Sequence, residues 1–531
     1  MANDTTMGND TTRGNDTTLA PTNVGSHLAK RAELNPDLEA VVDDAASRRF
    51  TYAELNQRAD QVANALLELG LQPGDRVATL LPNCHQFVEV FYGAARAGLV
   101  VVALNWRLVA DELAYILDNA GATVMISGPD YDAVVEDLAG RIGDDATPIE
   151  NWFRTEGGAA WSDWDLEVAS ASTEPVAPVG GGEDPMFLMY TSGTTGLPKG
   201  VLHTHNSVEW SILTVLATAD LRFGDRYLIC LPLFHVGALN PLLDTIYKGG
   251  TAVLMRTFDP VRIWEIFRDE NIDCTLAVPA MLQVMLQTYD PQVHQPLRLR
   301  WIMSGASPVP ASLIEDYAGL GLEVHQVYGL TESGGPACLI SPDAAMAHIG
   351  STGKAFFHTD VRIVDPQGND VGVDEPGEAI VRGRHIMAGY WNNQEATDEV
   401  IVDGWLHTGD VAVYDTDGFV FIRDRIKDMI ISGGENVYPA EIEDVIRTLP
   451  AVADVAVIGI PSDRWGETPL AVVVKADDAL EADTVLTYCG DKLARYKLPQ
   501  RVEFVTEIPR NPTGKALKKD LRVSFADVTV D

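Results

Sequence analysis

Apolar residues from about residue 25 onward recur with helix and strand spacings in turn. Thr51 and Glu54 form a capping box, and apolar residues at helical spacing follow it, so a helix is expected there. The pattern after this helix predicts strands at 77–80, 100–103 and 124–127, and helices at 88–97 and 112–119. Strands that alternate with helices in this way predict a parallel sheet buried between helices.

The pattern repeats and then changes along the chain. Residues 155–185, rich in Gly, Ala, Ser, Pro and Glu, are expected to be a surface connection, and a second alternating stretch follows from Met186 to about Tyr328. Beyond Gly350, short strands at 361–364 and 379–382 indicate a small antiparallel barrel. From about residue 425 we expect a separate α+β unit, with a helix at 441–447 and strands at 455–458 and 470–474.

These patterns predict the domain organisation and the fold class. Residues 1–24, which contain three Asn-Asp-Thr-Thr units, are expected to form a disordered tail. Residues 25–424 are expected to form a large N-terminal domain of parallel-sheet α/β subdomains plus the barrel. Residues 425–531 are expected to form the small α+β C-terminal domain.

Composition and charge narrow the possible partners. The 531 residues are 46% hydrophobic and 22% charged, which is typical of a globular protein, but 77 acidic residues face only 39 Lys and Arg, a net charge of −38. This charge excludes general nucleic-acid binding and argues against docking on anionic lipid. It is typical of a solvated acidic surface in a protein adapted to high salt, a halophilic protein.

Cysteine usage and hydropathy bear on the compartment. The five cysteines are dispersed, and none of them forms a CxxC pair, which fits a reducing cytosol. No apolar run reaches the length of a membrane span, and the N-terminus has no apolar signal region. We therefore expect a cytoplasmic protein. The sequence leaves open whether it forms a homodimer.

A polar loop after the strand at 186–189 is the sharpest local motif. Its glycines, hydroxyls and lysine would surround an anion with backbone N–H groups, O–H donors and one point charge. The residues are Thr191, Ser192, Gly193, Thr194, Thr195, Gly196 and Lys199. This chemistry suits a polyphosphate, although the loop is not a Walker A motif, because Lys199 follows Pro198. A flexible polar turn is the alternative, and a helix is expected to start at Asn206 with Glu209.

The loop and five further motifs, in this order, resemble the adenylate-forming superfamily of acyl-CoA synthetases, adenylation domains and firefly-type luciferases. The further motifs are Ser304–Pro308, Tyr328–Glu332, Gly404–Asp410, Asp424–Asp428 and Pro509–Lys515. The likeness covers nearly the whole chain from residue 25. The run from Asp428 to Ile442 is similar to the fatty acid–CoA ligase branch.

The resemblance implies an AMP-forming ligase that uses ATP, Mg²⁺ and coenzyme A. It would activate a medium- or long-chain fatty acid to an acyl-adenylate and then transfer the acyl group to the CoA thiol. An aryl or short-chain acid, or a carrier-protein thiol, is the alternative within the class. A nucleotide-binding scaffold that has lost catalysis is the alternative outside it. The resemblance also implies that the C-terminal domain rotates about a hinge at Lys427.

The resemblance assigns each site residue a role. Two anions must meet in adenylation, so fixed positive charge is needed, and Lys199 with the loop amides would supply it at the outer phosphates. Glu332 would hold Mg²⁺, Lys515 would reach the reacting oxygens, and Gly433 and Gly434 would enter the site for thioester formation. The roles near the nucleoside fall to Gly305 and Ala306 (adenine edge), Tyr328 (adenine face), Gly329, Thr331 (α-phosphate), Asp410 (ribose hydroxyls) and Arg425 (assisting Asp410).

Several of these residues also have an ordinary structural interpretation. Lys515 could be a solvated lysine in the cluster with Lys518 and Lys519, Asp410 a turn residue, and Tyr328 a core side chain. His235 borders the acyl pocket by resemblance, yet a lone histidine beside apolar residues is often structural. The apolar residues grouped with it, Trp210, Phe234, Val236 and Leu239, favour an acyl chain. We reject a metal site at His203 and His205, because no Cys or acidic cluster lies near them in sequence.

Overall fold

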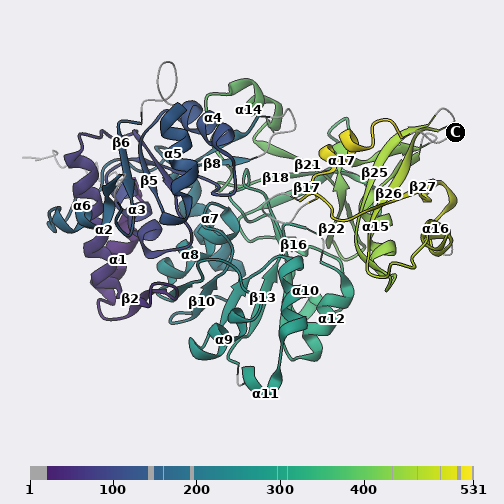
Figure 1. The fold of residues 1–531 in the computed structure, drawn as a ribbon, viewed down its shortest axis with the longest axis horizontal. Helices are drawn as coiled ribbons and strands as arrows, with labels where there is room; N and C mark the ends of the chain where they lie inside the picture. The colour runs from purple at the N-terminus through teal and green to yellow at the C-terminus, as the bar shows by residue number, and fades with distance from the viewer. Residues whose placement is uncertain are drawn as a thin grey trace, which may run out of the picture.

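The computed structural model describes residues 21–141, 149–158, 161–191, 197–295, 297–307, 309–432, 435–462, 465–490, 492–510 and 516–528. It has the predicted α/β class. Parallel sheets with covering helices form the larger part, an antiparallel sheet joins them, and an α+β unit with the C-terminus lies at the other end (Figure 1).

The first large sheet combines parallel strands with an antiparallel hairpin. Its strand order is β19-β9-β8-β4-β3-β5-β6-β7, and the pairings from β8 to β7 are parallel, whereas β9 is antiparallel to both β8 and β19. The strands are β3 (Arg76–Leu80), β4 (Val100–Ala103), β5 (Ala122–Ser127), β6 (Asn151–Arg154), β7 (Ser162–Asp163), β8 (Pro185–Thr191), β9 (Lys199–Thr204) and β19 (Gly389–Tyr390). The predicted strands at 77–80, 100–103 and 124–127 are thus confirmed.

The second large sheet has the order β16-β15-β14-β13-β12-β10-β11-β1-β2. Its central pairings are parallel, and β2, β15 and β16 add antiparallel edges. The strands are β1 (Glu39–Asp43), β2 (Arg48–Thr51), β10 (Arg226–Ile229), β11 (Thr251–Leu254), β12 (Cys274–Leu276), β13 (Trp301–Ser304), β14 (Glu323–Tyr328), β15 (Cys338–Leu339) and β16 (Lys354–Ala355).

Helices cover both faces of each large sheet. The alternation of side chains along a strand shows this, because Val77 of β3 joins a core shared by both sheets, whereas Ala78 joins an outer core. The helices are α1 (Gly25–Leu34), α2 (Tyr52–Glu68), α3 (His85–Arg96), α4 (Ala110–Ala120), η1 (Pro129–Tyr131), α5 (Asp132–Arg141), α6 (Trp164–Ser170), α7 (His205–Thr218), α8 (Val236–Lys248), α9 (Arg262–Asp269), α10 (Pro279–Thr288), α11 (Pro291–His294), α12 (Ala311–Gly319), α13 (Pro342–Ala345) and α14 (Gln394–Val400). Thr51 and Glu54 form the predicted capping box at α2.

A smaller antiparallel sheet follows, as the strand pattern predicts. Its order is β17-β18-β21-β20, with β22 paired to β21. The strands are β17 (Asp360–Val364), β18 (Gly377–Arg382), β20 (Ile401–Val402), β21 (Trp405–Tyr414) and β22 (Val420–Arg425). In the β21–β22 pairing Asp410 lies opposite Arg425, so the sheet brings two motifs into register.

The C-terminal part forms its own sheet and its own apolar cores. The sheet order is β24-β23-β26-β25, and β27 pairs in parallel with β26. The elements are η2 (Ile426–Asp428), β23 (Ile430–Ser432), β24 (Glu435–Val437), α15 (Pro439–Arg447), β25 (Val452–Ser462), β26 (Gly466–Lys475), α16 (Ala482–Gly490), η3 (Arg495–Lys497), β27 (Arg501–Val505) and α17 (Lys518–Ser524). The predicted helix and both strands of this unit are present.

Two local predictions were wrong. The stretch 155–185 is not only a surface connection, because it contains α6, whose Trp164 and Val168 are fully buried against the first sheet. The helix α7 starts at His205 rather than at Asn206, because Thr204 is its N-cap and accepts a hydrogen bond of 3.1 Å from the backbone N–H of Ser207.

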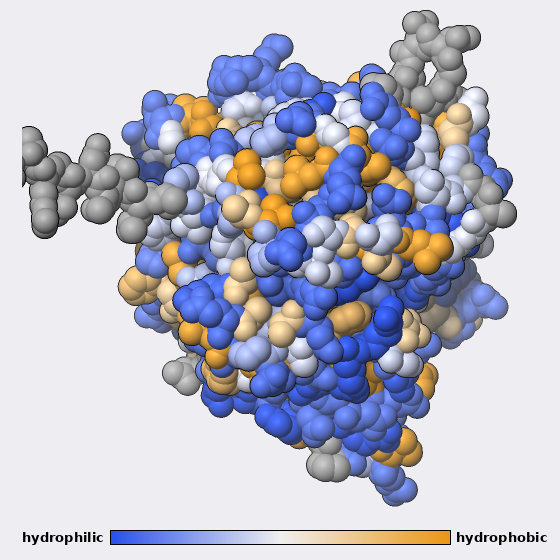
Figure 2. All heavy atoms as spheres, turned by 90° about the vertical axis from the view of Figure 1, so that its left-hand side faces the viewer, coloured by the Kyte–Doolittle hydropathy of each residue, from blue (hydrophilic) through white to orange (hydrophobic). Residues whose placement is uncertain are grey.

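The surface in Figure 2 is mainly hydrophilic, with apolar side chains gathered in its upper half. Within the described ranges, none of the helices is long and apolar enough to cross a bilayer.

Candidate active site

The polar loop is closed by a β-hairpin. Thr191 at the end of β8 pairs with Lys199 at the start of β9, so the two ends of the loop lie side by side. Ser192, Gly193, Thr194, Thr195 and Gly196 lie outside the described residues. Both ends of the loop are thus anchored in paired strands of the first sheet.

Asn119, at the end of α4, holds the base of this hairpin. Its side-chain oxygen accepts a hydrogen bond of 2.7 Å from the Tyr190 hydroxyl, and its carbonyl accepts one of 3.2 Å from the indole of Trp391. The backbone N–H of Trp391 in turn donates to the carbonyl of Gly200 at 2.7 Å. Sequence reasoning missed Asn119, because no spacing connects position 119 with positions 190 and 391.

A second group joins Lys199 to Glu332 through Tyr390. The Tyr390 hydroxyl donates to Glu332 Oε1 at 3.0 Å, and Lys199 Nζ lies 4.9 Å from the centre of the Tyr390 ring. All three side chains are half-buried. The sequence pointed to Lys199 and Glu332 but gave no signal for Tyr390, which lies outside the six motifs.

A third group surrounds Asp410, which is 4% exposed. The Tyr328 hydroxyl donates to Asp410 Oδ2 at 2.6 Å, and Arg425 Nε lies 2.6 Å from Asp410 Oδ1. Burial and the charge of Asp410 raise the pKa of Tyr328, so its hydroxyl stays protonated and donates. Burial alone would lower the pKa of Arg425, but the charge of Asp410 together with Tyr328, Glu332 and Asp428 outweighs burial, and the pKa is raised. A carboxylate oxygen has two lone pairs, so each oxygen of Asp410 can accept from one further donor besides Tyr328 or Arg425.

The second and third groups belong to one electrostatic site. The charge of Glu332 also contributes to the raised pKa of Arg425, and the charge of Arg425 is felt at Tyr390. Two carboxylates and an arginine from three separate motifs therefore interact electrostatically, and Lys199 of a fourth motif is connected to them through the Tyr390 ring.

Tight backbone contacts shape the neighbouring turns. A Cβ on Gly305 would lie 2.3 Å from the carbonyl oxygen of Val327, and one on Gly329 would lie 1.4 Å from that of Gly335. Ala306 has φ +66°, a left-handed conformation that an alanine rarely adopts. The carbonyl of Thr331 accepts a hydrogen bond of 2.8 Å from His203. The loops that carry Gly305, Ala306, Gly329 and Thr331 are therefore held with little freedom.

His235 is the N-cap residue of α8. Its Nε2 is buried, and it has no hydrogen-bond partner among the residues that the structure describes. Burial and the positive charge of Arg107 lower its pKa to about 3, so the imidazole is neutral. Phe234 packs on it with ring centres 4.4 Å apart, whereas Trp210 packs against His358 and Arg384.

His203 and His205, rejected as a metal site, have partners of their own. His203 also contacts the Ser207 hydroxyl at 3.2 Å, and His205 Nδ1 accepts a hydrogen bond of 3.1 Å from the backbone N–H of Val24. Burial lowers the pKa of both histidines to about 4.

Charged pairs connect the helix α17 to the rest of the C-terminal part. Lys518 Nζ lies 2.8 Å from Glu443 Oε1, and Arg522 lies 2.8 Å from Asp428 in η2. The Lys518 side chain is only 13% exposed, whereas its neighbour Lys519 is exposed. Lys427 is exposed. Gly433, Gly434 and Lys515 lie outside the described residues.

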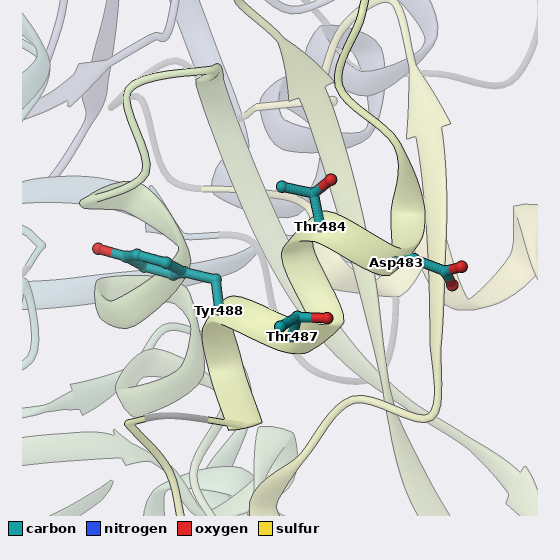
Figure 3. A pocket seen from close by; sticks show the side chains of 4 residues that line it. All are labelled: Asp483, Thr484, Thr487 and Tyr488. Carbon is teal, nitrogen blue, oxygen red and sulfur yellow. The ribbon is translucent and has the colours of Figure 1, made fainter.

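Two surface depressions in the described part of the chain lie apart from these residues. Figure 3 shows one of about 440 Å³, lined by Asp483, Thr484, Thr487 and Tyr488 of α16. A second of about 240 Å³ contains His85 and Arg256 near the ends of β3 and β11. Neither includes a residue that the sequence motifs point to.

Comparison with known proteins agrees with the motifs. Residues 28–391 match the AMP-binding enzyme family, and residues 441–515 match the AMP-binding enzyme C-terminal domain. The chain is 41% identical over 506 residues to the long-chain-fatty-acid–CoA ligase FadD13 of Mycobacterium tuberculosis, covering 95% of this chain and 99% of that protein. It is 40% identical over 506 residues to a feruloyl-CoA synthase of Amycolatopsis, covering 94% and 99%.

Solved structures show the same likeness. A fatty acyl CoA synthetase of Mycobacterium tuberculosis has a TM-score of 0.78 at 39% identity, covering 96% of this chain and 99% of that one. An o-succinylbenzoate CoA synthetase of Bacillus subtilis, solved with ATP and a magnesium ion, has a TM-score of 0.84 at 30% identity, covering 94% and 99%. The chain therefore belongs to the AMP-binding enzyme family, within the adenylate-forming superfamily.

Proposed function

We propose that the protein is an AMP-forming fatty acid–CoA ligase. The observation that carries the proposal is the convergence of Lys199, Glu332, Asp410 and Arg425 from four motifs on one site. A lysine and an arginine beside two carboxylates suit a bound magnesium nucleotide, whose phosphates need cations and whose ribose needs acceptors. Similarity to a long-chain-fatty-acid–CoA ligase over nearly the whole chain supports this activity.

In the proposed first step, a carboxylate oxygen attacks the α-phosphorus of ATP and pyrophosphate leaves. Lys199 and the backbone of the loop that starts at Thr191 would hold the outer phosphates, and Thr331 the α-phosphate. Asp410, positioned by Arg425, would accept hydrogen bonds from the ribose hydroxyls, while Tyr328 and the turn at Gly305, Ala306 and Gly329 would border adenine. Lys515 would neutralise the reacting oxygens.

Glu332 fits Mg²⁺. One of its oxygens receives the Tyr390 hydroxyl, and Mg²⁺ commonly binds one or two carboxylates together with substrate phosphates. The ion would supply positive charge at the phosphates when bound.

In the second step the CoA sulfur would attack the acyl carbonyl carbon and AMP would leave, with Gly433 and Gly434 bordering the thiol path after a rotation at Lys427. The domain boundaries near residues 24 and 424 are part of this proposal.

An aryl acid is the second candidate substrate, and an aromatic cluster beside His235 favours it. The Trp106 ring lies 5.8 Å from Phe234 and 5.9 Å from Tyr131, measured between centres. Flat rings stack well on such a surface. The similarity to a feruloyl-CoA synthase also supports this candidate.

A screen of acids separates the candidates. Aliphatic acids of two to eighteen carbons and cinnamic acids are offered with ATP, Mg²⁺ and CoA, and AMP release is measured. The proposal predicts a maximum at medium or long chains. A maximum at an aryl acid would move the assignment to the second candidate, and no ATP use with any acid would contradict both.

The proposed role of Lys515 has its own assay. We expect Lys515→Ala to abolish acid-dependent exchange of pyrophosphate into ATP, while thioester formation from supplied acyl-adenylate largely survives. Equal loss of both steps would contradict this role.

Repeating the screen of acids at several KCl concentrations tests the proposed halophilic adaptation, because salt should screen the repulsion among the surface carboxylates. Highest activity in dilute buffer would count against it.

A further inference from the structure

Tyr390 contacts both the lysine and the carboxylate that the proposed function places at the phosphates. We propose that Tyr390 is a positioning residue that keeps Lys199 and Glu332 from pairing with each other, so that the lysine stays available to phosphate and one oxygen of the carboxylate stays available to a divalent cation. This inference rests on the proposed function, and it adds a residue that the sequence motifs do not include.

The backbone of Tyr390 is held on two sides. It pairs with Val201 of β9, two residues after Lys199, so its position is tied to the phosphate-loop hairpin. Its N–H donates to the Thr397 hydroxyl of α14 at 2.8 Å. The neighbouring strand residue, Gly389, is also closely packed, because a Cβ there would lie 2.8 Å from Thr397 Cγ2. The backbone position from which the Tyr390 ring projects is therefore fixed relative to the β8–β9 hairpin.

Different parts of the Tyr390 side chain meet the two charges. The face of the ring carries the lysine, with Nζ 4.9 Å from its centre, and the hydroxyl in the ring plane donates to Glu332 Oε1 at 3.0 Å. A ring face attracts an ammonium group, and a phenol is a strong donor to a carboxylate. The contacts with Tyr390 thus leave the ammonium group of Lys199 able to donate to a phosphate and the other oxygen of Glu332 able to bind a cation.

Without this tyrosine the two charges would attract each other directly. An ion pair between Lys199 and Glu332 would neutralise the lysine and occupy the carboxylate oxygen that Mg²⁺ needs. A phenol is protonated at neutral pH, so the Tyr390 hydroxyl can donate to the carboxylate without taking its charge away.

The test measures metal binding without turnover. Full-length protein is titrated with Mn²⁺ in the presence of α,β-methylene-ATP, which cannot be cleaved at the reacting bond, and free Mn²⁺ is read by electron paramagnetic resonance. Affinity for the same nucleotide in EDTA is measured by calorimetry. The matched control is Tyr414→Phe, because Tyr414 is also half-buried and its hydroxyl donates to the carbonyl of Val361 at 2.9 Å in the antiparallel sheet.

Tyr390→Phe removes the donor but keeps the ring. We expect Mn²⁺ to bind roughly tenfold more weakly, the size typical of lost support for a metal ligand, with metal-free nucleotide affinity unchanged. Tyr390→Leu removes both contacts, and we expect it to weaken metal-free nucleotide binding as well, because Lys199 then pairs with Glu332. Tyr414→Phe should change neither affinity.

A double-mutant cycle excludes a merely structural effect. In Glu332→Gln the carboxylate is gone, so adding Tyr390→Phe should weaken Mn²⁺ binding no further. Wild-type Mn²⁺ affinity in Tyr390→Phe, or full additivity in the cycle, would overturn the inference and leave the proposed function standing. A wild-type protein that binds no nucleotide would instead overturn the proposed function and the inference with it.

Discussion

The Tyr328 hydroxyl and the Asp410 carboxylate form a hydrogen bond of 2.6 Å between two motifs that are 82 residues apart. Arg425 contacts the other oxygen of the same carboxylate at 2.6 Å. The two contacts hold Asp410 in one orientation at a buried position, which is what a group that receives two ribose hydroxyls requires.

Asp410→Ala should weaken ATP binding by at least about tenfold, because hydrogen bonds to a charged group are lost and Arg425 is left without its carboxylate partner. Calorimetry with an uncleavable ATP analogue measures the affinity. Tyr328→Phe keeps the ring and the carboxylate, so a smaller loss is expected. An unchanged affinity in Asp410→Ala would refute the ribose assignment.

The turn after β13 offers a matched pair of substitutions. Gly305→Ala places a Cβ 2.3 Å from the Val327 carbonyl oxygen, so the chain must move, and we expect roughly a hundredfold loss of kcat/KM for ATP. Ala306→Gly relieves a φ of +66° and should raise the free energy of unfolding by up to about 1 kcal/mol. Urea unfolding and steady-state kinetics measure both variants. Similar kinetics for Gly305→Ala and wild type would show that this turn does not shape the nucleotide site.

His235 predicts a definite pH dependence of stability. Its pKa is about 3 in the folded protein, against an ordinary value of 6.5, so the unfolded chain binds more protons in between. Stability from the neutral imidazole is therefore present above pH 6.5 and is lost as the pH falls toward 3.

His235→Asn removes this titration. When the pH falls from 7 to 5, the titration of His235 lowers the free energy of unfolding of the wild type by about 2 kcal/mol, and the variant does not suffer this loss. Urea unfolding at the two pH values gives the difference, and other titrating groups cancel because both proteins share them. A constant difference would mean that burial does not keep His235 neutral.

Lys518 is expected to stabilise the C-terminal unit. Its charge faces Glu443, Asp424 and Asp428, so Lys518→Met should cost about 3 kcal/mol by leaving acidic groups uncompensated in a largely buried place. The exposed neighbour provides the control, Lys519→Met. Equal urea midpoints for the two variants would contradict the ion-pair network.

The ion pair of Lys518 with Glu443 also predicts how the free energy of unfolding changes at alkaline pH. Burial would lower the pKa of Lys518, but Glu443, Asp424 and Asp428 together outweigh burial, and the pKa is raised above its ordinary value of 10.5. Stability from this raised pKa is fully present at neutral pH and is lost as the pH rises through the folded value. The difference in the free energy of unfolding between wild type and Lys518→Met should therefore become smaller only above pH 10.5.

The elements and the family were readable from the chain alone, because both depend on local pattern. The capping box at Thr51, the strand at 77–80 and the order of the six motifs involve residues close in sequence, and local spacing carries that information. Where the local pattern was weak, prediction failed, as in α6, a helix of seven residues that follows a Gly- and Ala-rich stretch at 157–160.

The partners across the site were set by long-range folding. The β1–β2 hairpin joins the second sheet beside β11, although about 200 residues separate them in sequence. In the same way Tyr390 reaches Lys199 only because β19 adds to the edge of β9, and Asn119 reaches Tyr190 only because α4 ends beside β8. Such contacts arise from the packing of sheets that already exist, so no periodicity within a single segment encodes them.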